Sequence, residues 1–128
     1  MANDIQLAGF TISADHYIDG KRVSSDKRFE LFSPIDQSRL GEICAASDDQ
    51  VDAAISAAAR AFPAWSALTA AERKPLLDAF AAEIGKRADA LATVESHDAG
   101  VLLSRMRHGV VKRAQENITW FAEHALKL

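Results

Sequence analysis

The period of the hydrophobic pattern in this 128-residue chain changes at Ser47. Before Ser47, short β-prone runs alternate with turn signals, and after it the apolar residues recur at helical spacing. Ser47 and Gln50 match a capping box, in which each residue satisfies a backbone N–H of the other at a helix start. The sequence therefore predicts a mixed α/β chain, with a tail and strands over residues 1–46 and helices over residues 47–128.

Turn signals divide the N-terminal segment. Residues 1–14 carry mixed signals and are expected to form a loosely held tail. Asp19-Gly20 lies between two short apolar runs and predicts a β-hairpin, because a type I′ turn needs positive φ at both central residues. Residues 29–32 and 40–45 predict two more short strands, and Ser33-Pro34 is expected to end the first of them in a turn.

The first predicted helix has one apolar face and is expected to end at Pro63, with Trp65 in the connection that follows. That face is made of residues three or four positions apart, namely Val51, Ala54, Ile55, Ala58 and Phe62. Thr69 and Glu72 match a second capping box and predict the start of the next helix. The apolar residues of this second helix are Leu76, Leu77, Phe80 and Ile84.

Two further helices are predicted in the last third of the chain. Residues 88–98 form an alanine-rich pattern, and Gly100 stands where a left-handed helix cap is expected. Residues 104–128 predict one long helix, although Gly109 weakens it by about 1 kcal/mol relative to alanine. The whole chain is therefore expected to be one partial domain with three to four packed helices after the strands.

Charge and cysteine content narrow the possible partners. A net charge of −3 gives no reason to expect nucleic acid or an anionic membrane surface, and no apolar run approaches the ~20 residues that span a bilayer. Cys44 is the one cysteine, so an internal disulfide or a zinc site is not expected. Since the first ten residues also lack the basic start of a signal peptide, a cytoplasmic location is expected.

The order of the local motifs resembles that of the NAD(P)-dependent aldehyde dehydrogenases. Ser33-Pro34 and then Leu40-Gly41-Glu42-Ile43 are similar to the family's Asn-Pro-x-Thr-Gly-Glu turn and strand, and residues 95–100 resemble its Glu-Thr-x-Asp-x-Gly. The hairpin at Asp19, the helix that runs into Trp65, and Glu72-Arg73 occur in the same order. The chain departs from the family pattern at Ser33, in the longer turn after Pro34, and at Pro75 inside a helix.

The last segment is similar to one group within that family. Arg113, Asn117 and the run Trp120-Phe121-Ala122 fit the Pro-Arg-x-x-x-Asn-x-x-Phe-Phe-Ala stretch of hydroxymuconate and aminomuconate semialdehyde dehydrogenases, with Lys112 in place of proline. This resemblance implies oxidation of a carboxylate-bearing semialdehyde.

The resemblance also implies what the chain lacks. In the family, this stretch opens the cofactor-binding domain, and the nucleophilic cysteine, the general-base glutamate and the glycine-rich cofactor loop come later than Leu128. No catalytic or cofactor-binding residue is therefore expected here. NAD or NADP is expected in a complete enzyme and no cofactor for this chain alone, which is expected to be inactive. The expected partner is the remainder of the enzyme or a second copy in a homo-oligomer. The alternative is a non-catalytic oligomerisation or partner-binding module derived from the family.

Two candidate sites follow from the resemblance. The last helix borders the family's substrate tunnel, and Met106, Val110, Arg113 and Asn117 share a helical face at spacings of four, three and four. Arg113 would hold a substrate carboxylate through a forked contact. The alternative interpretation makes Met106 and Val110 core residues and Arg113 a solvated surface charge.

The second candidate is a monovalent cation site. Family members hold such an ion with an acidic residue at the position of Asp98 and with backbone carbonyls of an early strand, here near Leu31 and Phe32. Hard cations prefer oxygen ligands of this kind. The alternative is that Asp98 only bonds nearby backbone N–H groups at the turn.

Overall fold

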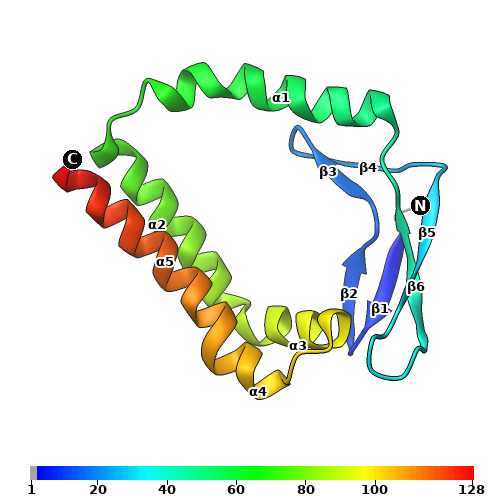
Figure 1. Ribbon diagram of the computed structural model, residues 1–128. Coiled ribbons are helices and arrows are strands. Elements are labelled where there is room, and N and C mark those ends of the chain that lie inside the picture. Colours follow the sequence, from blue (N-terminus) through cyan, green and yellow to red (C-terminus); the bar gives the residue numbers. More distant parts are fainter. Residues whose placement is uncertain (1–2) are drawn as a thin grey trace. The chain divides into compact units, whose positions relative to one another are not determined.

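Strands and helices occupy separate parts of the sequence, as the hydrophobic pattern predicted (Figure 1). The computed structural model describes residues 3–128, so the first two residues of the predicted tail lie outside the described part. The contacts divide the chain into two compact units, one up to Pro63 and one from Ala64 onward. The prediction of one partial domain over residues 1–128 stays a prediction.

The N-terminal unit contains three antiparallel strand pairs. They are β1 (Asp4–Leu7) with β2 (Phe10–Ser13), β3 (His16–Ile18) with β4 (Lys21–Val23), and β5 (Arg28–Phe32) with β6 (Arg39–Cys44). The turn between β3 and β4 has φ values of 51° at Asp19 and 76° at Gly20. These positive angles are those of a type I′ turn, so the predicted hairpin is confirmed.

The prediction of a loose tail over residues 1–14 is wrong for the described residues. β1 pairs with β2 from Asp4↔Ser13 to Leu7↔Phe10, around a turn at Ala8-Gly9 in which both residues have positive φ. Asp4 and Gln6 are exposed, whereas Leu7 is buried. The alternating polar and apolar residues of this short run, together with the Ala-Gly turn, are the signal of a hairpin.

β1 lies against β6, and Gly41 makes this approach possible. A Cβ atom at Gly41 would stand 2.8 Å from Cγ2 and 3.3 Å from Cβ of Ile5, and the glycine has a φ of 158°. The backbone amide of Cys44 also donates to the carbonyl of Ala14, at 3.0 Å. The N-terminal segment is therefore held to β6 by packing and by a backbone hydrogen bond.

Helix α1 (Asp48–Ser66) begins where the sequence predicted but ends later. The amide of Ser47 donates to Oε1 of Gln50 at 3.0 Å, and the amide of Gln50 donates to Oγ of Ser47 at 3.3 Å, which confirms the first capping box. The predicted end at Pro63 is wrong, because the helix continues to Ser66 and includes Trp65. The helix can continue through Pro63 because the fixed φ of proline is compatible with a helix, and only one backbone hydrogen bond is lost.

Helices α2 (Ala70–Lys86) and α3 (Ala88–Ala99) follow the predicted signals. Thr69 and Glu72 form a reciprocal capping box at the start of α2, and this helix continues through Pro75. α3 ends at Gly100, whose φ of 69° is the left-handed conformation expected of a helix cap. The side chain of Ser96 donates to the carbonyl of Val101 at 2.6 Å, so the turn after the cap is also fixed.

The final segment is helical but is not the one regular α-helix predicted over residues 104–128. It consists of α4 (Leu103–Arg105), the π-helical turn η1 (Met106–Val110), α5 (Val111–His124) and the 3₁₀ turn η2 (Ala125–Lys127). In η1 the amide of Val111 donates to the carbonyl of Met106, five residues earlier. The wider turn lets both Met106 and Val111 enter a core cluster with Ala92, which a regular helix would not place at this spacing.

The core of each unit is small. The buried apolar residues among those described are Leu7, Ala14 and Cys44 in the first unit, and Ala81, Ala92, Met106, Val111 and Ala122 in the second. α1 buries none of its residues: of its predicted apolar face, Ile55 is 62% and Phe62 65% exposed. Within the described part of the chain, none of the helices has the length and apolar character needed to cross a membrane.

The contact between Gly41 and Ile5 gives a test of the N-terminal packing. We expect Gly41→Ala to lower the free energy of unfolding by about 1–3 kcal/mol, because the added methyl group overlaps Ile5. The same substitution in an Ile5→Ala background should cost less, since the overlapping atoms are gone. Urea denaturation of the four proteins measures this coupling, and strictly additive effects would contradict the packing of β1 on β6.

Candidate functional site

An open pocket of ≈ 420 Å³ lies between α2 and α5, which pack side by side (Figure 1). All of its lining residues belong to the second unit. They are Trp65, Ala70, Arg73, Leu77, Asn117, Ile118, Phe121, Ala122 and Ala125. We call this cavity the α2–α5 pocket.

Small residues bring the two helices together beside the pocket. Ala81 of α2 and Ala122 of α5 are buried. Further along α2, a Cβ atom at Gly85 would lie only 2.8 Å from Nε2 of Gln115. Closely approaching helices leave room only for short side chains between them. The pocket is found where larger side chains, those of Leu77 and Phe121, line its wall.

Arg73 is the one charged residue in the lining of the α2–α5 pocket. Its Nη2 atom donates to the carbonyl of Ser66 at 3.0 Å, and its guanidinium carbon lies 5.5 Å from the centroid of the Trp65 ring. Its Nε atom is buried and has no hydrogen-bond partner. A carbonyl and an aromatic face thus stabilise this cation, while its Nε–H remains unsatisfied.

The capping box of α2 positions Arg73. Thr69 donates to Oε2 of Glu72 from its backbone amide at 2.8 Å and from its hydroxyl at 2.7 Å. These bonds, led by the one from the backbone amide, hold the pKa of Glu72 below its ordinary value of 4.5. The backbone amide of Arg73 in turn donates to the carbonyl of Thr69 at 3.0 Å. Hydrogen bonds from Thr69 to Glu72 and from Arg73 to Thr69 therefore fix the first turn of α2, which carries Arg73.

The four predicted tunnel residues have different environments. Met106 is 3% exposed and belongs to the core cluster with Ala92 and Val111, and Val110 packs against that cluster. Arg113 is exposed and makes no ion pair in the described part of the chain. Asn117 is exposed and lines the α2–α5 pocket. The packing of Met106 and Val110 agrees with the alternative interpretation of these two residues as core, and the tunnel assignment of all four stays a prediction.

The two residues predicted for the cation site are described in their own units. Asp98 is an exposed residue of α3, and Leu31 lies in β5 next to a β-bulge between Leu31 and Phe32. Among residues 3–128, no three His, Cys, Asp or Glu side chains gather in a group that could hold a metal ion. A site made of one carboxylate and backbone carbonyls is not such a group, so the cation site stays a prediction.

Cys44 is a buried thiol in the N-terminal unit. Its Sγ accepts from the amide of Ser25 at 3.4 Å and donates to Oδ1 of Asp15 at 3.6 Å. A hydrogen bond from the Asn3 side chain, more than the thiol, holds the pKa of Asp15 below its ordinary value. These surroundings are those of a structural cysteine.

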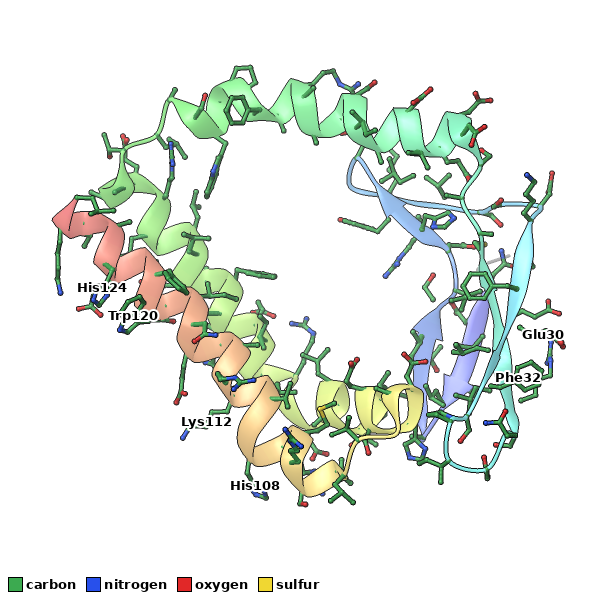
Figure 2. All side chains as sticks on the ribbon, in the orientation of Figure 1. Glu30, Phe32, His108, Lys112, Trp120 and His124 are labelled. Atoms are coloured by element: carbon green, nitrogen blue, oxygen red, sulfur yellow. The ribbon has the colours of Figure 1, made fainter. Side chains whose placement is uncertain are left out.

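One outer face of the last helical segment carries a row of polar and aromatic side chains. Figure 2 shows His108, Lys112, Trp120 and His124 along this face. The rings of Trp120 and His124 stack with centroids 3.5 Å apart, and Lys112 pairs with Glu116 at 3.5 Å. These contacts join residues four positions apart, and each histidine also lies within hydrogen-bond distance of the carbonyl four residues earlier.

The α2–α5 pocket was not predicted, although the sequence contained its components. Trp65, Arg73 and Phe121 belong to the motifs of the family resemblance, and Leu77 belongs to the apolar face of the second predicted helix. Arg73 and Leu77 are four residues apart, and so are Asn117 and Phe121, which places each pair on one helical face. The missing information was that these two faces lie opposite each other.

A sequence profile described as the aldehyde dehydrogenase family matches residues 22–128. The chain is similar to 5-carboxymethyl-2-hydroxymuconate semialdehyde dehydrogenase of Escherichia coli, with 27% identity over 109 residues, which cover 85% of this chain and 23% of that protein. It is also similar to 2-aminomuconic 6-semialdehyde dehydrogenase of Pseudomonas sp, with 35% identity over 109 residues, covering 84% of this chain and 22% of that protein.

A solved structure with the same fold is also similar to this chain. The crystal structure of PnpE in complex with nicotinamide adenine dinucleotide superimposes with a TM-score of 0.81 and 39% identity, over 88% of this chain and 23% of that one. The chain thus spans about a quarter of the length of the relatives it matches. Its short strand pairs and helices correspond to the N-terminal part of their fold.

The bonds around Glu72 predict a pH dependence of stability. A carboxyl group with a depressed pKa in the folded state stabilises the fold above its unfolded pKa, and this contribution is lost as the pH falls through the folded pKa. We expect Glu72→Gln to be less stable than the wild-type chain near neutral pH, with a difference that shrinks as the pH falls below 4.5. Glu72→Asp keeps the charge, but its side chain is too short for the capping box. This variant should therefore also lose the extra stability of the wild-type chain near neutral pH.

Thermal unfolding of the three proteins between about pH 3 and pH 7, where carboxyl groups titrate, measures the difference in stability between the wild-type chain and each variant. A constant difference across the range would contradict the role given to the Glu72 carboxylate.

Proposed function

This chain belongs to the aldehyde dehydrogenase family, and on that basis we propose that it is the N-terminal segment of an enzyme that oxidises an aldehyde to the acid with NAD or NADP. The observation that carries the proposal is the match of residues 22–128 to a family whose members are about four times as long. The family's reaction uses a cysteine thiolate as nucleophile and a nicotinamide cofactor as hydride acceptor. Both would be supplied by the part of the fold that follows this segment.

The described residues do not fit a dinucleotide site. The sequence has no glycine-rich loop that opens a helix after a strand, and such a loop is what holds a pyrophosphate. The lining of the α2–α5 pocket is mainly apolar, with one guanidinium group. We therefore assign no step of the reaction to residues of this chain. Its role is to support the cofactor-binding domain and to border the substrate.

A carboxylate-bearing semialdehyde is the proposed substrate class. Two relatives are named as dehydrogenases of such compounds, which are semialdehydes of muconic acids. Arg113 supports the proposal, since it is exposed and has no carboxylate partner in the part of the chain that the structure describes. A guanidinium group in this state is free to hold a substrate carboxylate through two hydrogen bonds. Asn117, one turn later on α5, would be the second polar contact.

Exposed apolar surface supports the proposal that the chain works with a partner. Leu76 and Phe80 lie one turn apart on α2 and are 54% and 58% exposed, and the apolar face of α1 is exposed as well. Large apolar side chains that stay exposed on neighbouring turns of one helix mark an interaction site. We propose that the rest of the enzyme covers it, and that an isolated chain covers it by self-association.

The isolated chain is expected to be inactive and to associate with itself. We expect no aldehyde-dependent formation of NADH or NADPH, because the chain lacks the family's nucleophile and cofactor loop. Sedimentation velocity should show oligomers whose size grows with protein concentration. A clean monomer over a wide concentration range would contradict the partner-covered surface, and aldehyde oxidation by the pure chain would contradict the assignment of chemistry to other residues.

The mass of the native protein separates this proposal from the non-catalytic alternative. A native mass well above 13.9 kDa would place the chain within a complete dehydrogenase. A native mass of 13.9 kDa, with no companion protein that restores activity, would favour an oligomerisation or partner-binding module.

Arg113 allows a test of the proposed substrate class in a complete enzyme that contains this segment. We expect Arg113→Ala to raise KM for a carboxylate-bearing semialdehyde by about tenfold or more, because a charge-assisted contact is lost. KM for a neutral aldehyde of equal length should change little. Lys112→Ala, the neighbouring exposed cation, serves as the matched control and should affect neither substrate. Equal effects of Arg113→Ala on both aldehydes would show that Arg113 does not contact the carboxylate.

A further inference from the structure

We propose that the α2–α5 pocket binds a small organic acid, whose apolar body fills the cavity and whose single carboxylate pairs with Arg73. This site is distinct from the proposed oxidation of an aldehyde, and it does not rest on that proposal. The charge of Arg73, the lining of the cavity and the position of Asn117 support this assignment.

The charge of Arg73 is uncompensated within the described residues. Several other cations do form ion pairs with carboxylates, namely Arg39, Arg60, Lys74, Lys86, Arg87, Arg107 and Lys112. Most of these are exposed, whereas Arg73 is half-buried and has only a carbonyl and an aromatic ring beside it. Burial makes an unpaired charge costly, so a carboxylate that enters the pocket would gain most at this residue.

The guanidinium group has donors available for that carboxylate. Nη2 is committed to the carbonyl of Ser66, and Nε is shielded from solvent without a partner. Nη1 has no hydrogen-bond partner among the described residues, so a bound carboxylate would accept from this donor. The side-chain amide of Asn117 lines the same pocket and would supply a second donor.

The cavity selects the rest of the ligand. Its volume of ≈ 420 Å³ lies in the range of roughly 300–1,000 Å³ that is typical of small-molecule sites. Trp65, Leu77, Ile118 and Phe121 make most of its wall apolar. One guanidinium group suits a monoanion better than a phosphate, which needs several donors. The ligand class is therefore a monocarboxylic acid with one ring or a short branched chain.

The pocket overlaps the predicted tunnel wall at a single residue. Of the four predicted tunnel residues, only Asn117 lines the pocket, and Met106 and Val110 pack in the core cluster. Ligand binding is thus expected to report on Trp65 and Arg73 without involving Arg113.

The test uses 3-phenylpropionate as probe and 3-phenylpropan-1-ol as its neutral counterpart. In a chain carrying Trp120→Phe, which removes the tryptophan outside this pocket, the emission of Trp65 should change saturably with the acid and much less with the alcohol. Arg73→Gln should weaken binding of the acid by about tenfold, the loss expected for one charge-assisted hydrogen bond. Arg105→Gln, which removes an exposed charge of the same kind from α4, should leave the affinity unchanged.

A second measurement does not depend on any Arg73 variant folding. In the wild-type chain, the Nε–H resonance of Arg73 should shift in nuclear magnetic resonance spectra with the acid and not with the alcohol. The proposal is overturned if the acid gives no saturable change, if the alcohol binds as well as the acid, or if Arg73→Gln and Arg105→Gln behave alike. It is equally overturned if the affinity falls as the protein concentration rises, because a second copy of the chain would then be the occupant.

Discussion

The close packing of α2 on α5 is the contact on which the second unit depends. Ala81, Gly85 and Ala122 keep side chains short where the helices meet, and Gln115 fills the space that Gly85 leaves. Because the helices approach so closely there, the larger residues beside this contact stand around a cavity instead of filling it. The α2–α5 pocket and the position of Arg73 in its wall are both consequences of this packing.

A second constraint is the shortage of buried apolar surface. Among residues 3–128, five of the eight buried apolar residues are alanine or cysteine, while Phe62, Leu76 and Phe80 are more than half exposed. Burial of a large side chain stabilises a fold by about 1.5–3 kcal/mol, so a chain that exposes so many of them leaves much of its possible stabilisation unused. This is the state expected of a segment whose apolar faces are completed by other parts of a larger fold, and the relatives about four times its length have such parts.

The π turn at Met106–Val110 links the packing of the core to the proposed substrate contacts. Its extra residue lets both Met106 and Val111 enter the cluster with Ala92, and it changes the faces on which the following residues of α5 lie. Arg113 and Asn117, which follow this turn, are exposed, whereas Met106 within it is buried. Regular helical spacing therefore predicts which residues share a face of α5 only for the residues after Val111.

The sequence by itself determined the hairpin from β3 to β4, the starts of α1 and α2, the end of α3, and the family. Capping boxes at Ser47 and Thr69, the turn at Asp19 and the cap at Gly100 depend on bonds between residues close in the chain, so their patterns can be recognised without a structure. Tertiary structure decided the packing of β1 against β6, the continuation of α1 past Pro63 and the π turn. It also decided that Arg73 faces an apolar cavity without a carboxylate, because contacts between segments distant in the sequence determine which side chains are buried and paired.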